Sequence, residues 1–176
     1  MRLDDLNALP EERAVADLLR CCGSTQWARL MSAARPFASL DAARERADAI
    51  WRSLGPDDWL EAFAAHPRIG EGAGAGGERP ASREESRAAA ASWSEQEQAG
   101  VRSADAAARD PLAEANRQYE AHFGYIFIVC ATGRSAGAML AMLERRLTNE
   151  PDIELRTAAE EQRMIMQLRI AKLITP

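Results

Sequence analysis

The sequence predicts an all-α protein: a single-domain helical bundle with one short, extended and buried segment near residues 125–131. Alanine, leucine, glutamate and arginine, which are strong helix formers, dominate the 176-residue chain, and β-branched residues are sparse. This length is enough for one compact domain with a core and is short for two. We therefore expect one domain over residues 1–176.

Apolar residues at helical spacing, together with helix-capping residues, divide the chain into helices. The expected helices cover residues 10–22, 25–34, 40–54, 57–65, 94–108, 112–122, 136–148 and 152–173. The residues expected at helix C-terminal ends are Gly23, Gly55, Gly124 and Asn149. The residues expected as N-caps are Ser24, Asp41, Ser135 and Asp152.

Two segments are expected to be non-helical. The run Tyr125–Ala131 is short, aromatic and β-branched, and Gly124 and Gly133 bound it, so it should be extended and buried. A lone extended segment in a helical protein leaves backbone groups that need partners, and a substrate can supply them. Residues 70–80 contain five glycines and should form a flexible surface loop. They follow no strand and lack a P-loop lysine, which argues against a phosphate-binding loop.

Charge and cysteine content exclude several classes of protein. The net charge of −5 provides no basic surface for nucleic acid, and no stretch approaches the roughly 20 apolar residues of a membrane span. The three cysteines, Cys21, Cys22 and Cys130, cannot form a disulfide framework, which favours a reducing cytoplasm. With two histidines and no Cys-x-x-Cys, we expect no metal and no cofactor unless carboxylates alone hold a hard ion. A small-molecule substrate is favoured.

Three short blocks carry the candidate chemistry: His66-Pro67-Arg68-Ile69-Gly70, then Ser94-Glu95-Gln96-Glu97-Gln98, then the run from Phe123 to Gly133. Proline disfavours a helical conformation for the preceding residue, so His66 should lie at the end of a helix. Each block alone has a structural interpretation. Ser94-x-x-Glu97 is also a capping box, and Arg169 alone would be a solvated or salt-bridged helix residue.

In this order, the three blocks resemble the 2-oxo-4-hydroxy-4-carboxy-5-ureidoimidazoline (OHCU) decarboxylase family, whose reaction yields (S)-allantoin in urate degradation. The resemblance implies an all-helical, cofactor-free and usually dimeric enzyme, a carboxy-lyase. It implies catalytic roles for His66 and Glu97. The substrate-binding residues that it implies are Pro67, Ser94, Gln98, Arg169 and the main chain of Phe127 and Val129. The glycine-rich segment is longer than in many members, and Ile126 replaces a common proline.

The substrate that this resemblance implies explains why no cofactor is needed. A ring carbon carries both carboxylate and hydroxyl, and the neighbouring C=N carbon accepts the electrons left by carbon dioxide. His66 would either protonate carbon or polarise the hydroxyl and carboxylate. Two alternatives remain: a decarboxylase or lyase acting on a related ureido or carboxylated heterocycle, and a non-catalytic helical ligand-binding dimer.

Overall fold

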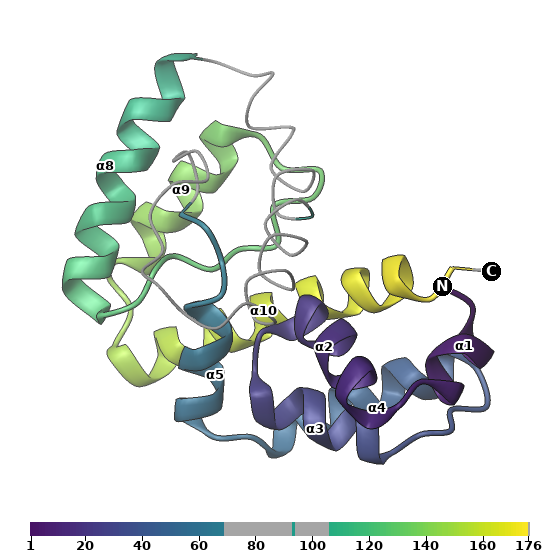
Figure 1. The fold of residues 1–176 in the computed structure, drawn as a ribbon. Helices are drawn as coiled ribbons and strands as arrows, with labels where there is room; N and C mark the ends of the chain where they lie inside the picture. The colour runs from purple at the N-terminus through teal and green to yellow at the C-terminus, as the bar shows by residue number, and fades with distance from the viewer. Residues whose placement is uncertain (69–92, 94–105, 176) are drawn as a thin grey trace.

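The computed structural model describes residues 1–68, 93 and 106–175. Every regular element in this part of the chain is a helix, which confirms the all-α prediction (Figure 1). In chain order the helices are α1 (Leu3–Ala8), α2 (Glu11–Cys22), α3 (Thr25–Ala33), α4 (Leu40–Ser53), α5 (Pro56–Phe63), α8 (Ala106–Phe123), α9 (Ala136–Arg146) and α10 (Pro151–Leu173).

The long helix α10 organises the fold. Helices α2, α4 and α5 pack against it, and α3 packs against α2, α4 and α5. Helices α8 and α9 pack on each other and form a second group, on the other side of α10 in Figure 1. Two buried apolar clusters match these two groups, and α10 contributes only to the first of them.

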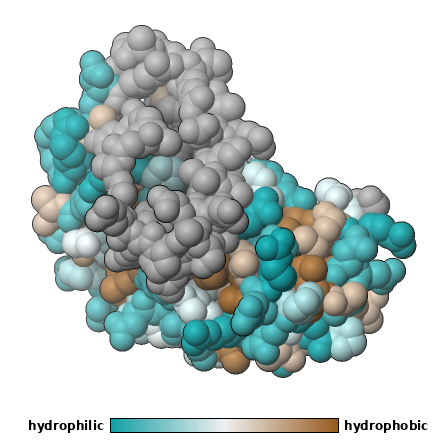
Figure 2. Space-filling view, in the orientation of Figure 1, coloured by the Kyte–Doolittle hydropathy of each residue, from teal (hydrophilic) through white to brown (hydrophobic). Residues whose placement is uncertain are grey.

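Two fully buried tryptophans join helices of the first cluster. Trp27 donates from Nε1 to the Ala47 carbonyl at 3.2 Å, which links α3 to α4. Trp51 donates to the Ala159 carbonyl at 3.0 Å, which links α4 to α10. Each indole therefore buries its apolar surface without leaving its N–H unsatisfied. On the face drawn in Figure 2, apolar residues lie in small groups among hydrophilic ones.

The segment between α8 and α9 is non-helical, as predicted, and its middle is buried, whereas Tyr125, Ile126 and Cys130 are half-buried. Phe127, Ile128 and Val129 are each at most 5% exposed. Phe127 and Val129 belong to the second cluster, whereas Ile128 belongs to the first. This alternation is expected of an extended chain, whose successive side chains point to opposite sides. The segment therefore joins the two clusters.

Two helix boundaries differ from the prediction. The six-residue α1 was missed; its start is stabilised where the Arg2 N–H donates to the Asp5 carboxylate at 3.0 Å. Helix α8 begins at Ala106 and continues through Pro111, where the sequence predicted a break. Pro111 is exposed and lies in the second turn, where it removes one backbone hydrogen bond. Most of the predicted helix 94–108 lies outside the described residues.

The predicted serine caps and glycine ends are confirmed in part. Ser24 and Ser135 cap α3 and α9 by accepting from the backbone N–H three residues on, both at 3.2 Å. Gly23 and Gly124 follow α2 and α8 with positive φ angles of 86° and 81°. Left-handed backbone of this kind favours glycine.

Four cap predictions are wrong, and proline explains two of them. Proline prefers the first position of a helix. Pro151 and Pro56 occupy that position, so Glu150 rather than Asp152 is the N-cap of α10. Gly55 is likewise the N-cap of α5 rather than the end of α4.

The remaining two cap errors come from competing side chains. Ser39 caps α4 by accepting from the Ala42 N–H at 3.0 Å, which leaves Asp41 in the first turn. Helix α9 ends at Arg146 with Leu147 as its C-cap, and the side-chain amide of Asn149 instead donates to Glu154 at 2.7 Å.

Gly23 lies where α2 approaches the residues that follow α5. A Cβ at this position would lie 2.6 Å from the Ala65 Cβ, and φ is already left-handed. We expect Gly23→Ala to lower the free energy of unfolding by about 2 kcal/mol, measured by urea denaturation. Gly55→Ala is the matched control, because a Cβ there meets nothing within 4 Å, and its expected loss is below about 1 kcal/mol. Equal losses would show that the close approach at Gly23 is unimportant.

Candidate functional site

His66 lies just beyond the end of α5, as the His-Pro step predicts. Its backbone N–H donates to the Phe63 carbonyl at 3.1 Å, and the helix does not continue to Pro67, which is half-buried. Two residues further on, Arg68 donates to both carboxylate oxygens of Glu120 on α8, at 2.8 and 2.9 Å. These hydrogen bonds hold the pKa of Glu120 below its usual value. The described part of this block, from His66 to Arg68, is therefore held at both ends.

Two buried polar side chains of α10 act on His66. Gln162 is 0% exposed and Arg169 is 3% exposed. They are seven residues apart, or about two helical turns, and so lie on the same face of α10. Both influence the imidazole: Arg169 through its charge and Gln162 through its side-chain amide. The structure therefore brings together His66 and Arg169, two of the residues that the sequence selected.

The end of α2 holds these two α10 side chains in place. Gln162 Nε2 donates to the Cys22 carbonyl at 3.1 Å, and an Arg169 guanidinium N–H reaches the Arg20 carbonyl at 3.5 Å. Carbonyls in the last turn of a helix lack partners within the helix and carry its partial negative charge. They therefore suit an amide donor and a guanidinium.

The imidazole of His66 is neutral at pH 7. Burial lowers the pKa of His66 to about 3; the Arg169 charge acts in the same direction, and Gln162 acts in the opposite one. The residue as a whole is half-buried, but its Nε2 atom is buried and has no hydrogen-bond partner in the described part of the chain. One nitrogen of a neutral imidazole carries a proton, and the other can act as a base.

The neighbouring cysteines do not supply a nucleophile. Cys21 and Cys22 are buried in the core, and burial raises the pKa of each thiol to about 12 despite the nearby Arg169 charge. Thiols of this kind stay protonated and unreactive at neutral pH. Packing explains both residues.

The extended segment passes beside this site. The Tyr125 ring packs on Phe63, three residues before His66, with ring centroids 5.4 Å apart. The Cys130 N–H donates to Glu161 Oε2 at 2.7 Å, next to Gln162 on α10. Within the described residues, the main-chain groups of Phe127 and Val129 have no hydrogen-bond partner. Buried backbone groups of this kind need partners from outside the described residues.

A buried ion pair anchors the same segment from the other side. Arg146 on α9 donates from Nε to Glu154 Oε1 at 2.7 Å and lies over the Phe127 ring, 4.6 Å from its centroid. Tyr119 and Asn149 also donate to the Glu154 carboxylate. Burial and the hydrogen bond to Glu154 raise the pKa of Tyr119. A second Arg146 N–H donates to the Ile128 carbonyl at 2.8 Å, so the network fixes the backbone between Phe127 and Val129.

Ser94, Glu97 and Gln98 lie outside the described residues. Trp93, which immediately precedes them, is described, and the Arg20 guanidinium lies 4.7 Å from the centroid of its ring. An arginine at this distance makes a favourable cation–π contact. Because the Arg20 carbonyl also contacts Arg169, Arg20 connects Trp93 to Arg169.

The sequence prediction missed Gln162, Glu161 and Arg146. A signal for Gln162 was present, because it is a polar residue within the apolar stripe of the last helix. The buried apolar residues of that stripe are Ala158, Ala159, Ile165, Met166, Ile170 and Leu173. A polar residue inside such a stripe is buried and must find partners. Nothing in the sequence marks Arg146 or Glu161, since charged residues are ordinary on helix surfaces.

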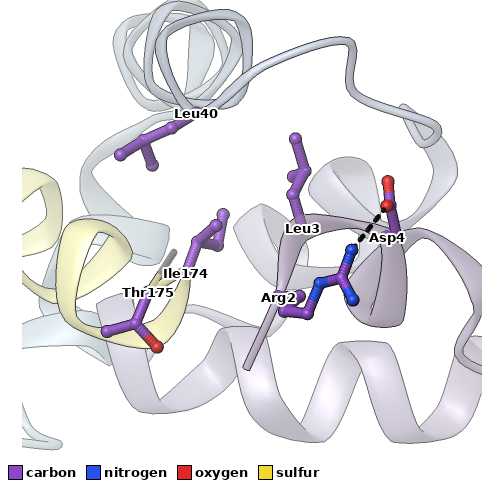
Figure 3. Close-up of a pocket in the computed structure, with 6 residues that line it drawn as sticks. All are labelled: Arg2, Leu3, Asp4, Leu40, Ile174 and Thr175. Atoms are coloured by element: carbon purple, nitrogen blue, oxygen red, sulfur yellow. Dashed lines mark ion pairs between the residues drawn. The ribbon is translucent and has the colours of Figure 1, made fainter.

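A pocket of about 270 Å³ lies elsewhere, where the two ends of the described chain meet (Figure 3). The Met1 amino group donates to the Leu173 carbonyl at 2.8 Å. The pocket is lined by Arg2, Leu3, Asp4, Leu40, Ile174 and Thr175. It contains none of the predicted site residues. No described helix is long and apolar enough to span a membrane, and the described residues form no cluster of three metal-ligating side chains.

Comparison with known proteins places the chain in a class of helical decarboxylases. A crystal structure of OHCU decarboxylase in the presence of (S)-allantoin superposes with a TM-score of 0.75 and 36% identity, covering 92% of this chain and 99% of that one. A sequence model described as OHCU decarboxylase matches residues 7–171. The chain therefore belongs to the OHCU decarboxylase family.

Individual relatives are consistent with this assignment. A bifunctional uric acid degradation protein of Arabidopsis thaliana is 41% identical over 155 residues, covering 88% of this chain. The chain spans only 45% of that protein's length. An OHCU decarboxylase of Haloferax volcanii is 25% identical over 173 residues, covering 98% of this chain and 95% of that protein.

Proposed function

We propose that this protein decarboxylates OHCU to (S)-allantoin, a step of urate degradation, without a cofactor. The observation that carries the proposal is the buried, neutral imidazole of His66, with the Arg169 guanidinium acting on it. Membership of the OHCU decarboxylase family supports the choice of substrate. A base and a cation close together suit a substrate that carries a carboxylate and must move a proton.

The chemistry of the substrate defines what the site must do. The bond from the ring carbon to the carboxylate breaks, and its electron pair forms a C=C bond to the ureido-bearing carbon. The C=N pair moves to the ring nitrogen, which takes up a proton. The hydroxyl then loses its proton and becomes a carbonyl, while the ureido-bearing carbon gains a proton and becomes the stereocentre of allantoin. The protein has to orient the ring, place charge and direct these protons.

Each candidate residue has a role in this scheme. Because the imidazole of His66 is neutral, we expect it to accept the hydroxyl proton, which then becomes available for the ureido-bearing carbon. Arg169 would hold a substrate oxygen through its planar fork, and the free main-chain groups of Phe127 and Val129 would bind the ring edge.

The remaining roles are proposed from the sequence blocks that carry the family resemblance. We assign Pro67 to the wall of the site and Ser94 and Gln98 to substrate hydrogen bonds. Glu97 would accept from the N–H groups of the ring or the ureido group, and its charge near the departing carboxylate would raise the energy of the bound substrate.

The setting of the enzyme is also proposed. We expect a homodimer, because the family resemblance implies one, and we expect the protein in the cytoplasm. The cytoplasmic location is supported by the three cysteines, none of which forms a disulfide in the structure.

A coupled assay tests the proposed reaction. Urate is oxidised and hydrolysed in place to give OHCU, and the absorbance of OHCU is followed after this protein is added. We expect its decay to accelerate in proportion to protein concentration and to survive dialysis against chelator. A decay rate equal to that of the uncatalysed reaction would refute the function.

A further inference from the structure

Gln162 is buried more completely than an ordinary helix glutamine. It is 0% exposed and lies within the apolar stripe of α10. Burying an amide is unfavourable unless its polar atoms find partners. Its Nε2 has one, the Cys22 carbonyl at 3.1 Å. Its Oε1 is buried and has none in the described part of the chain.

The orientation of this amide follows from its hydrogen bond to the Cys22 carbonyl. The Cys22 carbonyl can only accept, so the NH₂ group of Gln162 must face it. Oε1 is thereby directed away from Cys22, as an acceptor without a donor. His66 Nε2 is likewise buried without a partner in the described part of the chain, and the Gln162 side chain raises the pKa of His66 against the effect of burial.

Among the described side chains near the imidazole, the others do not provide this acceptor. Arg169, also on α10, is a donor only and opposes protonation of His66. From α2, Cys21 and Cys22 present thiols that stay neutral. On α5, which carries His66, the two Glu61 carboxylate oxygens accept from Thr25 at 2.6 and 2.8 Å.

We propose that Gln162 is the positioning residue for His66: its Oε1 accepts the imidazole N–H, so that the opposite ring nitrogen is unprotonated and faces the substrate. A hydrogen bond at one imidazole nitrogen decides which tautomer is present and how the ring is oriented. The oxygen also stabilises the imidazolium that forms when His66 takes the substrate proton. This inference rests on the proposed function for its kinetic consequence, but the tautomer itself does not depend on any substrate.

The tautomer can be measured directly in the whole protein. The chain has two histidines, so ¹⁵N-histidine labelling gives two sets of ring signals, and a His122→Gln variant assigns them. Long-range ¹⁵N–¹H correlation spectra then report which nitrogen of His66 carries the proton. We expect one tautomer to dominate in the wild type and a mixture of the two in Gln162→Met.

Gln167→Met is the matched control for this substitution. Gln167 lies on the same helix, but its amide bonds to Arg44 and Asp48 on α4. Its replacement should change stability and leave the His66 tautomer unchanged. If Gln162→Met gives the same His66 spectrum as Gln167→Met, the inference is overturned.

Kinetics separate positioning from a purely structural role. Loss of a residue that orients a metal-bound histidine typically lowers metal affinity or activity by roughly 10- to 100-fold. We expect a loss of that order in kcat for Gln162→Met, with KM nearly unchanged. Gln162→Glu supplies the second arm: it keeps an acceptor oxygen but adds negative charge, so the pKa of His66 should rise. An unshifted His66 titration in Gln162→Glu would overturn the inference even if Gln162→Met failed to fold. A wild type that lacks turnover but shows one Gln162-dependent tautomer would refute only the proposed function.

Discussion

His66→Asn is expected to reduce turnover of OHCU by roughly 10²- to 10⁴-fold, the usual contribution of general acid–base catalysis. Asparagine retains polar atoms at this position but cannot take and return a proton near neutral pH. His122→Asn is the matched control. His122 is the other histidine, is exposed on α8 and packs on the neighbouring Phe123 ring, so its replacement should leave turnover unchanged. Near wild-type activity in His66→Asn would show that the chemistry lies elsewhere.

The same variant has a predictable effect on stability against pH. The pKa of His66 is about 3 in the folded protein, below its ordinary value of 6.5. Between these values the unfolded chain binds a proton at His66 that the folded protein does not. His66 therefore makes the free energy of unfolding fall as the pH drops below about 6.5. His66→Asn should lose less stability than the wild type between pH 7 and pH 5, and parallel curves from urea denaturation would contradict the buried neutral state.

Arg146→Met is expected to destabilise the fold by about 3–5 kcal/mol, because it leaves the Glu154 carboxylate buried without its cation. Glu154 is 0% exposed and Arg146 is 6% exposed, so water cannot replace the lost partner. Arg145→Met is the matched control: Arg145 precedes Arg146 on α9 and is exposed, and its replacement should change stability by less than about 0.5 kcal/mol. Urea denaturation monitored by circular dichroism measures both.

A double variant separates the buried charge from lost packing. Arg146→Met combined with Glu154→Leu removes both charges, so it should be less destabilised than Arg146→Met alone. If the double variant is as unstable as the sum of the two single variants, the ion pair is not the source of the loss. Activity should fall with Arg146→Met beyond the effect of unfolding, because Arg146 also holds the Ile128 carbonyl.

Local sequence patterns predicted most of the fold because helix periodicity and caps act over a few residues. Ser24, Ser135 and Gly23 were identified correctly on this basis. The errors at Asp152 and Gly55 arose where a neighbouring proline, Pro151 or Pro56, occupies the first position of the helix. Helix α1 was missed because a six-residue helix gives too short an apolar pattern.

The candidate site was predictable only where a motif spans neighbouring residues. His66 and Arg169 stood out through the family resemblance, and the structure brings them together. Gln162 and Arg146 act on residues that are distant in sequence. Gln162 is 96 positions from His66, and Arg146 is 18 positions from Ile128. Such pairings depend on how α2, α9 and α10 pack, which local sequence does not encode.

The stereochemistry of the product tests the proposed function most directly. Spontaneous decay of OHCU gives racemic allantoin, whereas a site that holds one ring face against Arg169 and the Phe127–Val129 main chain admits the proton from one side only. We predict a large excess of (S)-allantoin, recorded by circular dichroism of the product while the enzyme outpaces the background reaction. A racemic product, formed at any rate, would contradict it.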